Sequence, residues 1–276
     1  SSIAPNIRTV VMDHTSARGP CYARAKTQEL WRGEEFYLQI DSHMRFEKAW
    51  DKSLIEILSA CPSAKPILTT YPGDYPVSTD AKTHCTPVVS ILCAKGFAKD
   101  GQLRLTAKAL SSSPSKPVVS RFWAAGFAFS RSGVLKTTPY DPYLVDIFFG
   151  EEASMSSRLW TAGWDFFCPP VPLVYHKWSR AGRPTFRELK RDPDVKRQSC
   201  KRVEHVLRTN CYPNLYLIGD YDLGTSRTMQ QFSHFTGVDF NKQTISESAK
   251  RGGVSPGGLS EDQLNALLSL AFKGKP

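Results

Sequence analysis

Short apolar segments alternate with helix-like segments through the first quarter of the chain, and this alternation restricts the fold more than any other feature of the sequence. The apolar segments have the length of strands, and Trp50, Leu54 and Leu58 in a later segment would share one helical face. Alternating strands and helices predict an α/β fold with an open, mixed and largely parallel Rossmann-like sheet flanked by helices. Ligands of such sheets bind at the carboxyl ends of the strands. The expected strands are residues 6–13, 35–40 and 66–71, and the expected helices are residues 17–31 and 47–60.

The rest of the chain is less regular. Residues 72–118 mix Pro, Gly and Ser with two strand candidates, which predicts an irregular, hairpin-like insert. A helix is expected at residues 153–162, and a strand broken by prolines at residues 164–176. Beyond residue 180 come a charged helix, a glycine-rich loop and a last helix at about residues 260 to 272. We expect a main domain over residues 1–200 and a helical and loop extension, packed on it, over residues 201–276.

Charge and cysteine content restrict the setting of the protein. The 276 residues carry a net charge of +10, and residues 180–208 hold ten Lys or Arg against four acids, which could attract phosphates or form a solvated helix face. The longest apolar segment, residues 122–129, is too short to span a bilayer, so we expect no membrane segment. Seven scattered cysteines without C-x-x-C spacing argue against a zinc knuckle or a disulfide framework. We therefore expect a cytoplasmic protein, or one of the Golgi lumen if an anchor precedes the chain.

Acid and histidine side chains follow two of the apolar segments. Asp41 and His43 come directly after EFYLQI, and their spacing points both side chains the same way if the strand geometry continues. His176 ends the apolar segment LVYH in the same manner. Asp41 could instead cap a helix, and His176 could be a satisfied core residue. One carboxylate with two imidazoles makes a metal site with open positions, so the three residues together predict a metal centre.

Other polar residues are candidates for the same edge of the sheet. Glu151 and Glu152 begin the helix after a Gly-Glu-Glu turn, where acids either stabilise the helix dipole or could hold a hydroxyl and accept a proton. Gly126 lies within an aromatic segment and is either core or a place where backbone approaches a sugar closely. Cations that could neutralise a metal-bound diphosphate are Arg18, Arg24, Lys177 and Arg180.

Four segments carry a resemblance to a known family: IDSHMRF, DIFFGEEASMSSRLWTAG, VYHKWSR and YDLGTSRTMQQFSHFTGVDF. In this order and at these separations they resemble the polypeptide α-N-acetylglucosaminyltransferases (glycosyltransferase family 60), which modify hydroxyproline on the Skp1 protein. The chain is more distantly similar to the polypeptide N-acetylgalactosaminyltransferases. Those enzymes have a Trp-Gly-Gly-Glu-Asn segment where this chain has Phe148, Phe149, Gly150, Glu151 and Glu152.

The resemblance implies a GT-A-like fold and a metal-dependent, retaining transfer of N-acetylglucosamine from UDP-GlcNAc to a hydroxyl of Ser, Thr or hydroxyproline. The acceptor would be a protein or peptide, with a Skp1-like protein as one candidate. Asp41, His43 and His176 would bind Mn²⁺ or Mg²⁺, and Glu151 would lie nearest the reacting sugar. Arg18, Arg24 and Gly126 match donor-site positions. Proteins of this fold usually begin with a further β-α unit that carries much of the uridine site, and we expect this chain to lack part of that unit.

Two other functions stay open from the residues alone. A non-haem iron oxygenase also uses two histidines and one carboxylate, although its usual His-x-Asp order is reversed here and its all-β barrel disagrees with the alternating helices. A nucleic-acid-binding module could use residues 180–208. No aromatic stacking pattern accompanies that basic segment, so we expect no nucleic-acid partner.

Overall fold

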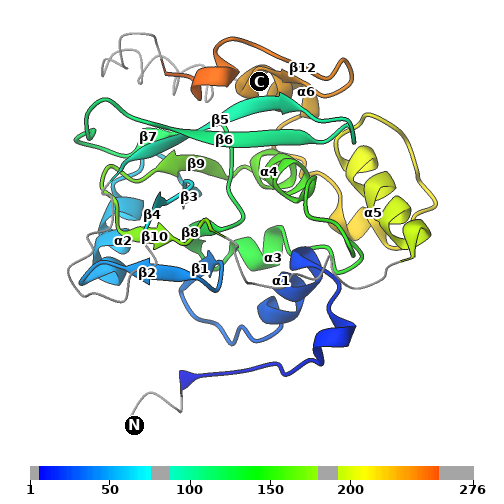
Figure 1. Ribbon diagram of the computed structural model, residues 1–276, viewed down its shortest axis with the longest axis horizontal. Helices are drawn as coiled ribbons and strands as arrows, with labels where there is room; N and C mark the ends of the chain where they lie inside the picture. Colours follow the sequence, from blue (N-terminus) through cyan, green and yellow to red (C-terminus); the bar gives the residue numbers. More distant parts are fainter. Residues whose placement is uncertain (1–5, 76–87, 180–191, 255–276) are drawn as a thin grey trace.

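The computed structural model describes residues 6–75, 88–179 and 192–254 (Figure 1). The strands in these ranges are β1 (Phe36–Ile40), β2 (Met44–Phe46), β3 (Pro66–Thr69), β4 (Gly73–Asp74), β5 (Ser90–Phe97), β6 (Leu103–Ala109), β7 (Val118–Val119), β8 (Phe127–Arg131), β9 (Asp165–Cys168), β10 (Val174–His176), β11 (Val238–Asp239) and β12 (Thr244–Ile245). The helices are α1 (Pro20–Gln28), α2 (Trp50–Ser59), α3 (Val134–Thr137), α4 (Glu151–Thr161), α5 (Pro193–Val206) and α6 (Met229–Thr236), with 3-10 helices η2 (His14–Ser16), η4 (Ile218–Tyr221) and η5 (Ala249–Arg251).

The central sheet of the described residues has five strands in the order β1-β8-β3-β9-β7. Its β3–β9 pair is parallel, whereas β8 runs antiparallel to both β1 and β3, and β7 antiparallel to β9. The predicted open mixed sheet is confirmed, but the expectation of largely parallel pairing is wrong, because β8 and β7 insert between or beside strands of the opposite direction. Since β1 and β3 both oppose β8, their carboxyl ends lie at the same edge of the sheet.

Helices cover both faces of this sheet, as the alternation predicts. Successive strand residues point to opposite faces. Leu68 and Phe167 therefore pack on one face with Leu54 of α2. Their preceding neighbours, Ile67 and Phe166, pack on the other face in the core that includes α1 and α4. The helices expected at residues 17–31, 47–60 and 153–162 are confirmed as α1, α2 and α4, and the strands expected at 35–40 and 66–71 as β1 and β3.

Two smaller sheets flank the central one. Strands β2, β10 and β4 form a three-stranded sheet in which β10 runs antiparallel to β2 and parallel to β4. The predicted broken strand of residues 164–176 is thus divided between two sheets, with β9 in the central one and β10 in the smaller one. Strands β5 and β6 form the expected hairpin, which lies across the upper side of the molecule in Figure 1.

The expectation of a buried strand at residues 6–13 is wrong. These residues are exposed and belong to no strand, and Figure 1 shows the segment running along the lower side of the molecule. Val11, for example, is 92% exposed. An apolar run favours a strand only where a neighbouring strand provides hydrogen bonds, and no described strand pairs with this one. The opening unit of the described chain is therefore α-β and not β-α-β.

The part of the chain after α5 packs against the end of α4. The backbone N–H of Gly224 donates to Thr161 Oγ1 (2.9 Å), and the N–H of Ser226 donates to the Thr161 carbonyl (2.9 Å). A side chain at Gly224 would place its Cβ 2.4 Å from Ala162 Cα, so only glycine fits there. The predicted domain division at residue 200 falls within α5 and remains a prediction. The last helix, expected at about residues 260 to 272, lies outside the described residues.

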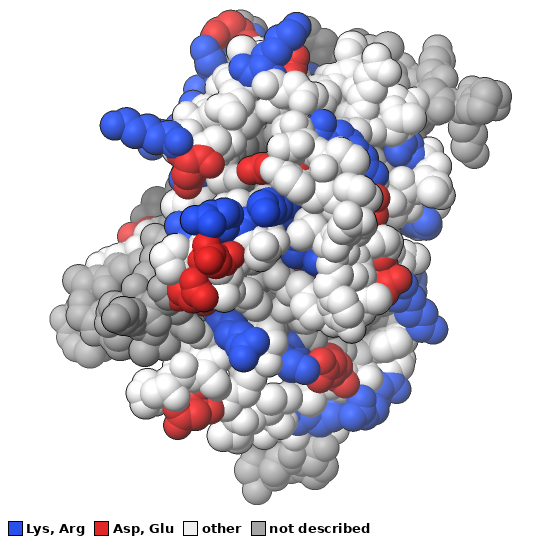
Figure 2. All heavy atoms as spheres, turned by 90° about the vertical axis from the view of Figure 1, so that its right-hand side faces the viewer, with Lys and Arg blue, Asp and Glu red and all other residues white. Residues whose placement is uncertain are grey.

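The charged helix is confirmed as α5, and its charges have mixed surroundings. Arg202 is buried and paired with Asp141, with 2.6 Å between Nε and Oδ2, whereas Arg197 is exposed and paired with Asp194. Figure 2, which shows the right-hand side of Figure 1, has basic and acidic side chains interspersed on this face. Residues 180–191 of the basic segment lie outside the described residues.

Two expectations from composition can be compared with the described residues. None of the helices there has the length and apolarity needed to cross a bilayer. The six cysteines in these ranges are all free thiols, and four of them are buried: Cys21, Cys61, Cys93 and Cys168.

Candidate functional site

Asp41, Ser42 and His43 connect the central sheet to the three-stranded sheet. Strand β1 ends at Ile40 and β2 begins at Met44, so the strand geometry does not continue through the tripeptide. Backbone hydrogen bonds hold it at both ends: the N–H of Asp41 donates to Gly126 O (3.2 Å), and the N–H of Lys177 donates to His43 O (3.1 Å). The tripeptide is therefore held between the start of β8 and the end of β10.

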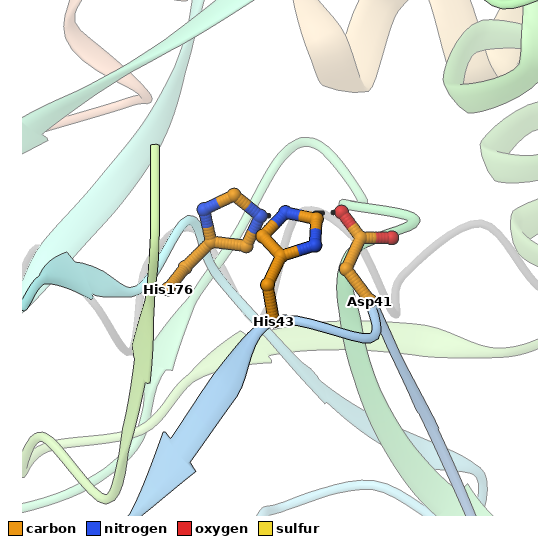
Figure 3. Close-up of side chains that lie close together, drawn as sticks. All are labelled: Asp41, His43 and His176. Carbon is orange, nitrogen blue, oxygen red and sulfur yellow. Dashed lines mark hydrogen bonds and ion pairs between the residues drawn. The ribbon is translucent and has the colours of Figure 1, made fainter. Parts of the chain in front are cut away.

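The side chains of Asp41, His43 and His176 converge at this connection. One ligand atom from each lies within 4.8 Å of the others, and the two imidazole rings are 4.4 Å apart. Figure 3 shows the rings and the carboxylate turned toward one another, with His176 contributed by β10. His176 Nε2 lies 3.2 Å from Asp41 Oδ2. The three residues grouped from the sequence thus lie close together, and their role as metal ligands remains a prediction.

The chemistry of the three side chains fits a divalent cation. His176 is buried, and its Nε2 faces Asp41 Oδ2 at 3.2 Å, so this ring nitrogen and the carboxylate could bind the same ion. Burial would raise the pKa of Asp41, but the hydrogen bond with His176 and the nearby Arg24 guanidinium outweigh it and lower that pKa. A carboxylate that stays ionised beside two imidazoles matches the donor set of Mn²⁺, Zn²⁺ or Fe²⁺ sites.

Arg24, in the middle of α1, connects this cluster to the first turn of α4. Its Nη2 lies 2.8 Å from Asp41 Oδ1, and its Nη1 forms an ion pair with Glu151. Burial opposes the charge of Arg24, but the carboxylate of Glu151, the Tyr140 phenol and the carboxylate of Asp41 keep its pKa well above the ordinary value. Pro20 in the first turn of α1, after Gly19 at positive φ, sets the direction in which the helix leaves the turn. Arg24 is thus a fixed cation between two carboxylates.

Glu151 is buried, and both of its described partners hold it from the side of the core. Besides Arg24, the Tyr140 hydroxyl donates to Glu151 Oε1 (2.9 Å), and Gln39 Nε2 lies 2.9 Å from the same hydroxyl. Burial and the charge of Glu151 raise the pKa of Tyr140 well above its ordinary value, so the phenol keeps its proton and remains a donor. These contacts place Glu151 where it orients Arg24, at the wall of the site.

Glu152 lies beside Glu151 in a different environment. The Tyr71 hydroxyl donates to Glu152 Oε2 (2.5 Å), and the N–H of Ala125 donates to Oε1 (3.0 Å). Burial raises the pKa of Glu152 to about 7, although these two hydrogen bonds act in the opposite direction. Neighbouring carboxylates with different environments are typical of sites that handle protons.

A cavity of about 730 Å³ opens above these residues. Arg18, Arg24, Gly126, Glu151, Glu152 and the three residues of the metal cluster all line it. Lys177 does not line the cavity; its backbone supports His43 as described above. Arg180 lies outside the described residues, so its predicted place remains a prediction. A side chain at Gly126 would put its Cβ 3.3 Å from Asp41 Oδ2, so the glycine leaves room for the metal-cluster carboxylate.

Several residues of the cavity were missed by reasoning from the sequence. Trp178 is 45% exposed. Its ring centroid lies 4.1 Å from that of His176 and 5.4 Å from that of Tyr71. Its Nε1–H donates to Pro72 O (3.0 Å), which joins the segments after β3 and β10. Arg104, from the β5–β6 hairpin, stacks on Phe149 with 3.5 Å between Cζ and the ring centroid. The one signal in the sequence was position: Tyr71 and Trp178 lie at or near the ends of apolar segments, as Asp41 does.

The chain was compared with protein families, with solved structures and with curated proteins, and the first two comparisons give matches. A family model described as glycosyltransferase (GlcNAc) matches residues 2–242. A solved structure, the crystal structure of GalNAc-T7 with UDP, GalNAc and Mn²⁺, is similar with a TM-score of 0.51 and 16% sequence identity, over 79% of this chain and 44% of that one. The chain thus spans less than half of that protein, and the likeness shows a shared GT-A fold. A search of curated proteins gives no match.

Proposed function

Because the chain belongs to the glycosyltransferase (GlcNAc) family, we propose that it moves N-acetylglucosamine from UDP-GlcNAc to a hydroxyl group of a protein, with Mn²⁺ or Mg²⁺ as cofactor. The observation that carries the proposal is the convergence of Asp41, His43 and His176 at the ligand edge of the sheet. The bound UDP, GalNAc and Mn²⁺ of the GalNAc-T7 structure support a nucleotide sugar and a divalent metal for this chain too. An iron oxygenase is disfavoured by the family and by the open mixed sheet.

The three ligands would hold the metal, which supplies positive charge to the diphosphate as the anomeric bond breaks. Arg24 keeps the Asp41 carboxylate aimed at the ligand position. Arg18, exposed at the mouth of the cavity, is placed to meet the outer phosphate oxygens. Lys177 and Arg180 would add charge from the segment after β10. Gly126 leaves the space beside Asp41 in which the donor's diphosphate and sugar would lie.

The two glutamates take different parts in this scheme. Glu151 is held by Arg24 and Tyr140. It fixes the Arg24 guanidinium and forms part of the cavity wall against which the sugar would lie. Glu152, with its pKa of about 7, holds Tyr71 and the Ala125 backbone and can exchange a proton near neutral pH. Retention of the anomeric configuration, which the family resemblance implies, needs no protein nucleophile if the acceptor hydroxyl attacks from the leaving-group side. Its proton then passes to a phosphate oxygen. Accordingly, Glu151→Gln should reduce turnover far more than donor binding, and unchanged turnover would remove Glu151 from the site.

The acceptor is the least determined part of the proposal. The resemblance of the four sequence segments to the Skp1-modifying enzymes favours a hydroxyproline, Ser or Thr hydroxyl on a protein. We propose membership of that subfamily on the same resemblance, and a cytoplasmic setting because the scattered cysteines suggest no disulfide framework.

A donor panel tests the proposed function. Release of UDP from several UDP-sugars is measured with and without Mn²⁺, on the unmodified chain, on His176→Ala and on the control His14→Ala, whose side chain is exposed. We expect the fastest release from UDP-GlcNAc, dependent on metal, and lost in His176→Ala but kept in His14→Ala. Equal release by His176→Ala would contradict the proposed metal site, and metal-independent release would contradict the cofactor.

A further inference from the structure

A second, larger cavity lies at the opposite edge of the central sheet from the candidate active site. Its volume is about 1620 Å³. Lys65 and Asp165, at the amino ends of the parallel strands β3 and β9, line it together with the first turn of α6. The metal cluster lies beyond the carboxyl end of β1, which runs in the same direction as β3. The two cavities are therefore separated by about the length of a strand of five residues, roughly 17 Å.

The walls of this cavity, which we call the α6 cavity, combine aromatic rings with uncompensated positive charge. Trp160 stacks with Phe235 at 5.3 Å and forms part of the lining. The Arg121 guanidinium has no hydrogen-bond or ion-pair partner in the described part of the chain, and burial lowers its pKa. Lys65 Nζ donates to a backbone carbonyl, that of Ala162 (3.1 Å), and has no carboxylate partner there. Two cations thus line the cavity without an acidic partner among residues 6–75, 88–179 and 192–254.

The acids of the α6 cavity are already paired. Asp165 accepts a hydrogen bond from Arg227 Nη2 (2.8 Å) and another from the Ser63 hydroxyl (2.6 Å). Asp239 faces Lys242 at 3.8 Å. A half-buried guanidinium without a counter-ion carries a desolvation cost that a carboxylate from a ligand would offset. The half-buried Met229, Phe235 and Ile245, which also line the cavity, would at the same time bury apolar side chains of that ligand.

We propose that the α6 cavity binds an acidic peptide segment, with Glu or Asp next to apolar side chains, that belongs to the acceptor protein. The assignment of the segment to an acceptor rests on the proposed function, whereas the binding of an acidic peptide does not. A nucleic acid fits less well, because its phosphates form a continuous row of charge, whereas two separate cations suit isolated carboxylates.

Binding at the α6 cavity would tether the acceptor near the active site. About ten extended residues span up to roughly 33 Å, which is enough to pass from one edge of the sheet to the other. A tether of this kind raises the effective concentration of the hydroxyl-bearing segment to about the millimolar range. The enzyme would then select proteins that carry an acidic segment at this spacing from the modified residue.

The test uses the full chain without metal or donor, so its outcome is separate from that of the proposed function. Fluorescence anisotropy measures the binding of a short fluorescein-labelled peptide of alternating Glu and Leu, and of its Gln and Leu counterpart. The variants are Arg121→Gln and Lys65→Met, with Arg32→Gln, an exposed arginine outside both cavities, as the control. We expect the acidic peptide to bind the unmodified chain and Arg32→Gln, and to bind Arg121→Gln and Lys65→Met roughly tenfold more weakly.

Three results would overturn the proposal: equal binding of the Gln and Leu peptide, equal binding by both cavity variants, or displacement of the acidic peptide by a short DNA oligonucleotide. Thermal unfolding monitored by circular dichroism identifies a variant that does not fold, and Lys65→Met then decides the result if Arg121→Gln fails. With an acceptor that carries the acidic segment, Arg121→Gln should raise KM and leave kcat unchanged. A lower kcat in Arg121→Gln with an unchanged KM would also contradict the proposed binding site.

Discussion

The Arg24 guanidinium lies 2.8 Å from the Asp41 carboxylate, and the same guanidinium holds Glu151 on its other side. One cation therefore fixes a metal ligand and an acid of the cavity wall. Because the side chain of Glu151 is only 4% exposed, removing its partner leaves a buried, uncompensated charge.

Replacing Arg24 should destabilise the protein strongly. We expect Arg24→Met to lower the free energy of unfolding by about 3–5 kcal/mol, because breaking a buried ion pair strands its partner. Urea denaturation measures the change. The control is Arg131→Met, whose pair with Glu35 is exposed on both sides and should contribute no more than about 1 kcal/mol. Losses of similar size in the two variants would show that Glu151 does not depend on Arg24.

Gly126→Ala should weaken metal binding without unfolding the protein. The new Cβ would lie 3.3 Å from Asp41 Oδ2, so the carboxylate must move by a few tenths of an ångström. Shifting a ligand in this way is expected to reduce metal affinity roughly tenfold, as loss of a supporting contact does at other metal sites. Calorimetric titration with Mn²⁺ measures it. Gly133→Ala, with open space around its Cβ, is the matched control and should bind as the unmodified chain does.

Glu152 should make stability depend on pH. Its pKa rises from 4.5 to about 7 on folding, so the folded state holds the proton more tightly than the unfolded state. The stabilisation from this group is fully present below about pH 4.5 and is lost as pH rises through about 7, by at most about 3 kcal/mol. Denaturation from about pH 5 to about pH 8 should show this slope in the unmodified chain and in the exposed control Glu56→Gln. Glu152→Gln should lack it, and an unaltered slope in that variant would refute the assignment.

Arg202 should anchor α5 to the segment between α3 and α4, which contains Asp141. Its pair with Asp141 is buried on both sides, with side chains 4% and 3% exposed, and its Nη1 also donates to Tyr216 O (2.7 Å). We expect Arg202→Leu to cost about 3–5 kcal/mol of unfolding free energy, because it leaves Asp141 buried without its cation. Arg197→Leu in the same helix removes an exposed pair and should cost less than about 1 kcal/mol. Comparable melting temperatures for the two variants would contradict the anchoring role.

Asp41, His43 and His176 could be singled out because each lies at or just after the end of an apolar segment of strand length, where ligands of α/β sheets bind. Their contact was not encoded in any local pattern, since it depends on β10 pairing with β2 across a long stretch of chain. The role of Arg24 was predictable only as a nearby cation. Its place between two carboxylates follows from how α1 packs, which neither helix propensity nor spacing determines.

Other features had signals that pointed elsewhere. The apolar residues 6–13 favour a strand, yet no described strand pairs with them. Tyr71 and Trp178 were not singled out, because the sequence does not distinguish a ring that lines a cavity from one that fills a core. The segment around Gly224 carried part of the family resemblance, and in the structure its glycine is required by close packing against Ala162. The residue type at a position such as Trp178 or Gly224 therefore does not show whether the residue serves packing or ligand binding.

Asp41 and His176 are separated by 135 positions in the chain and come from different sheets. An ion held between them would act as a reversible cross-link that closes a very long loop, and closing a loop of this length restricts the unfolded chain considerably. Metal binding would then raise the melting temperature, and the rise would grow with the concentration of free metal. Scarcity of the ion would weaken the junction between the two sheets as well as the catalyst, so the protein's lifetime in the cell would follow its supply of metal.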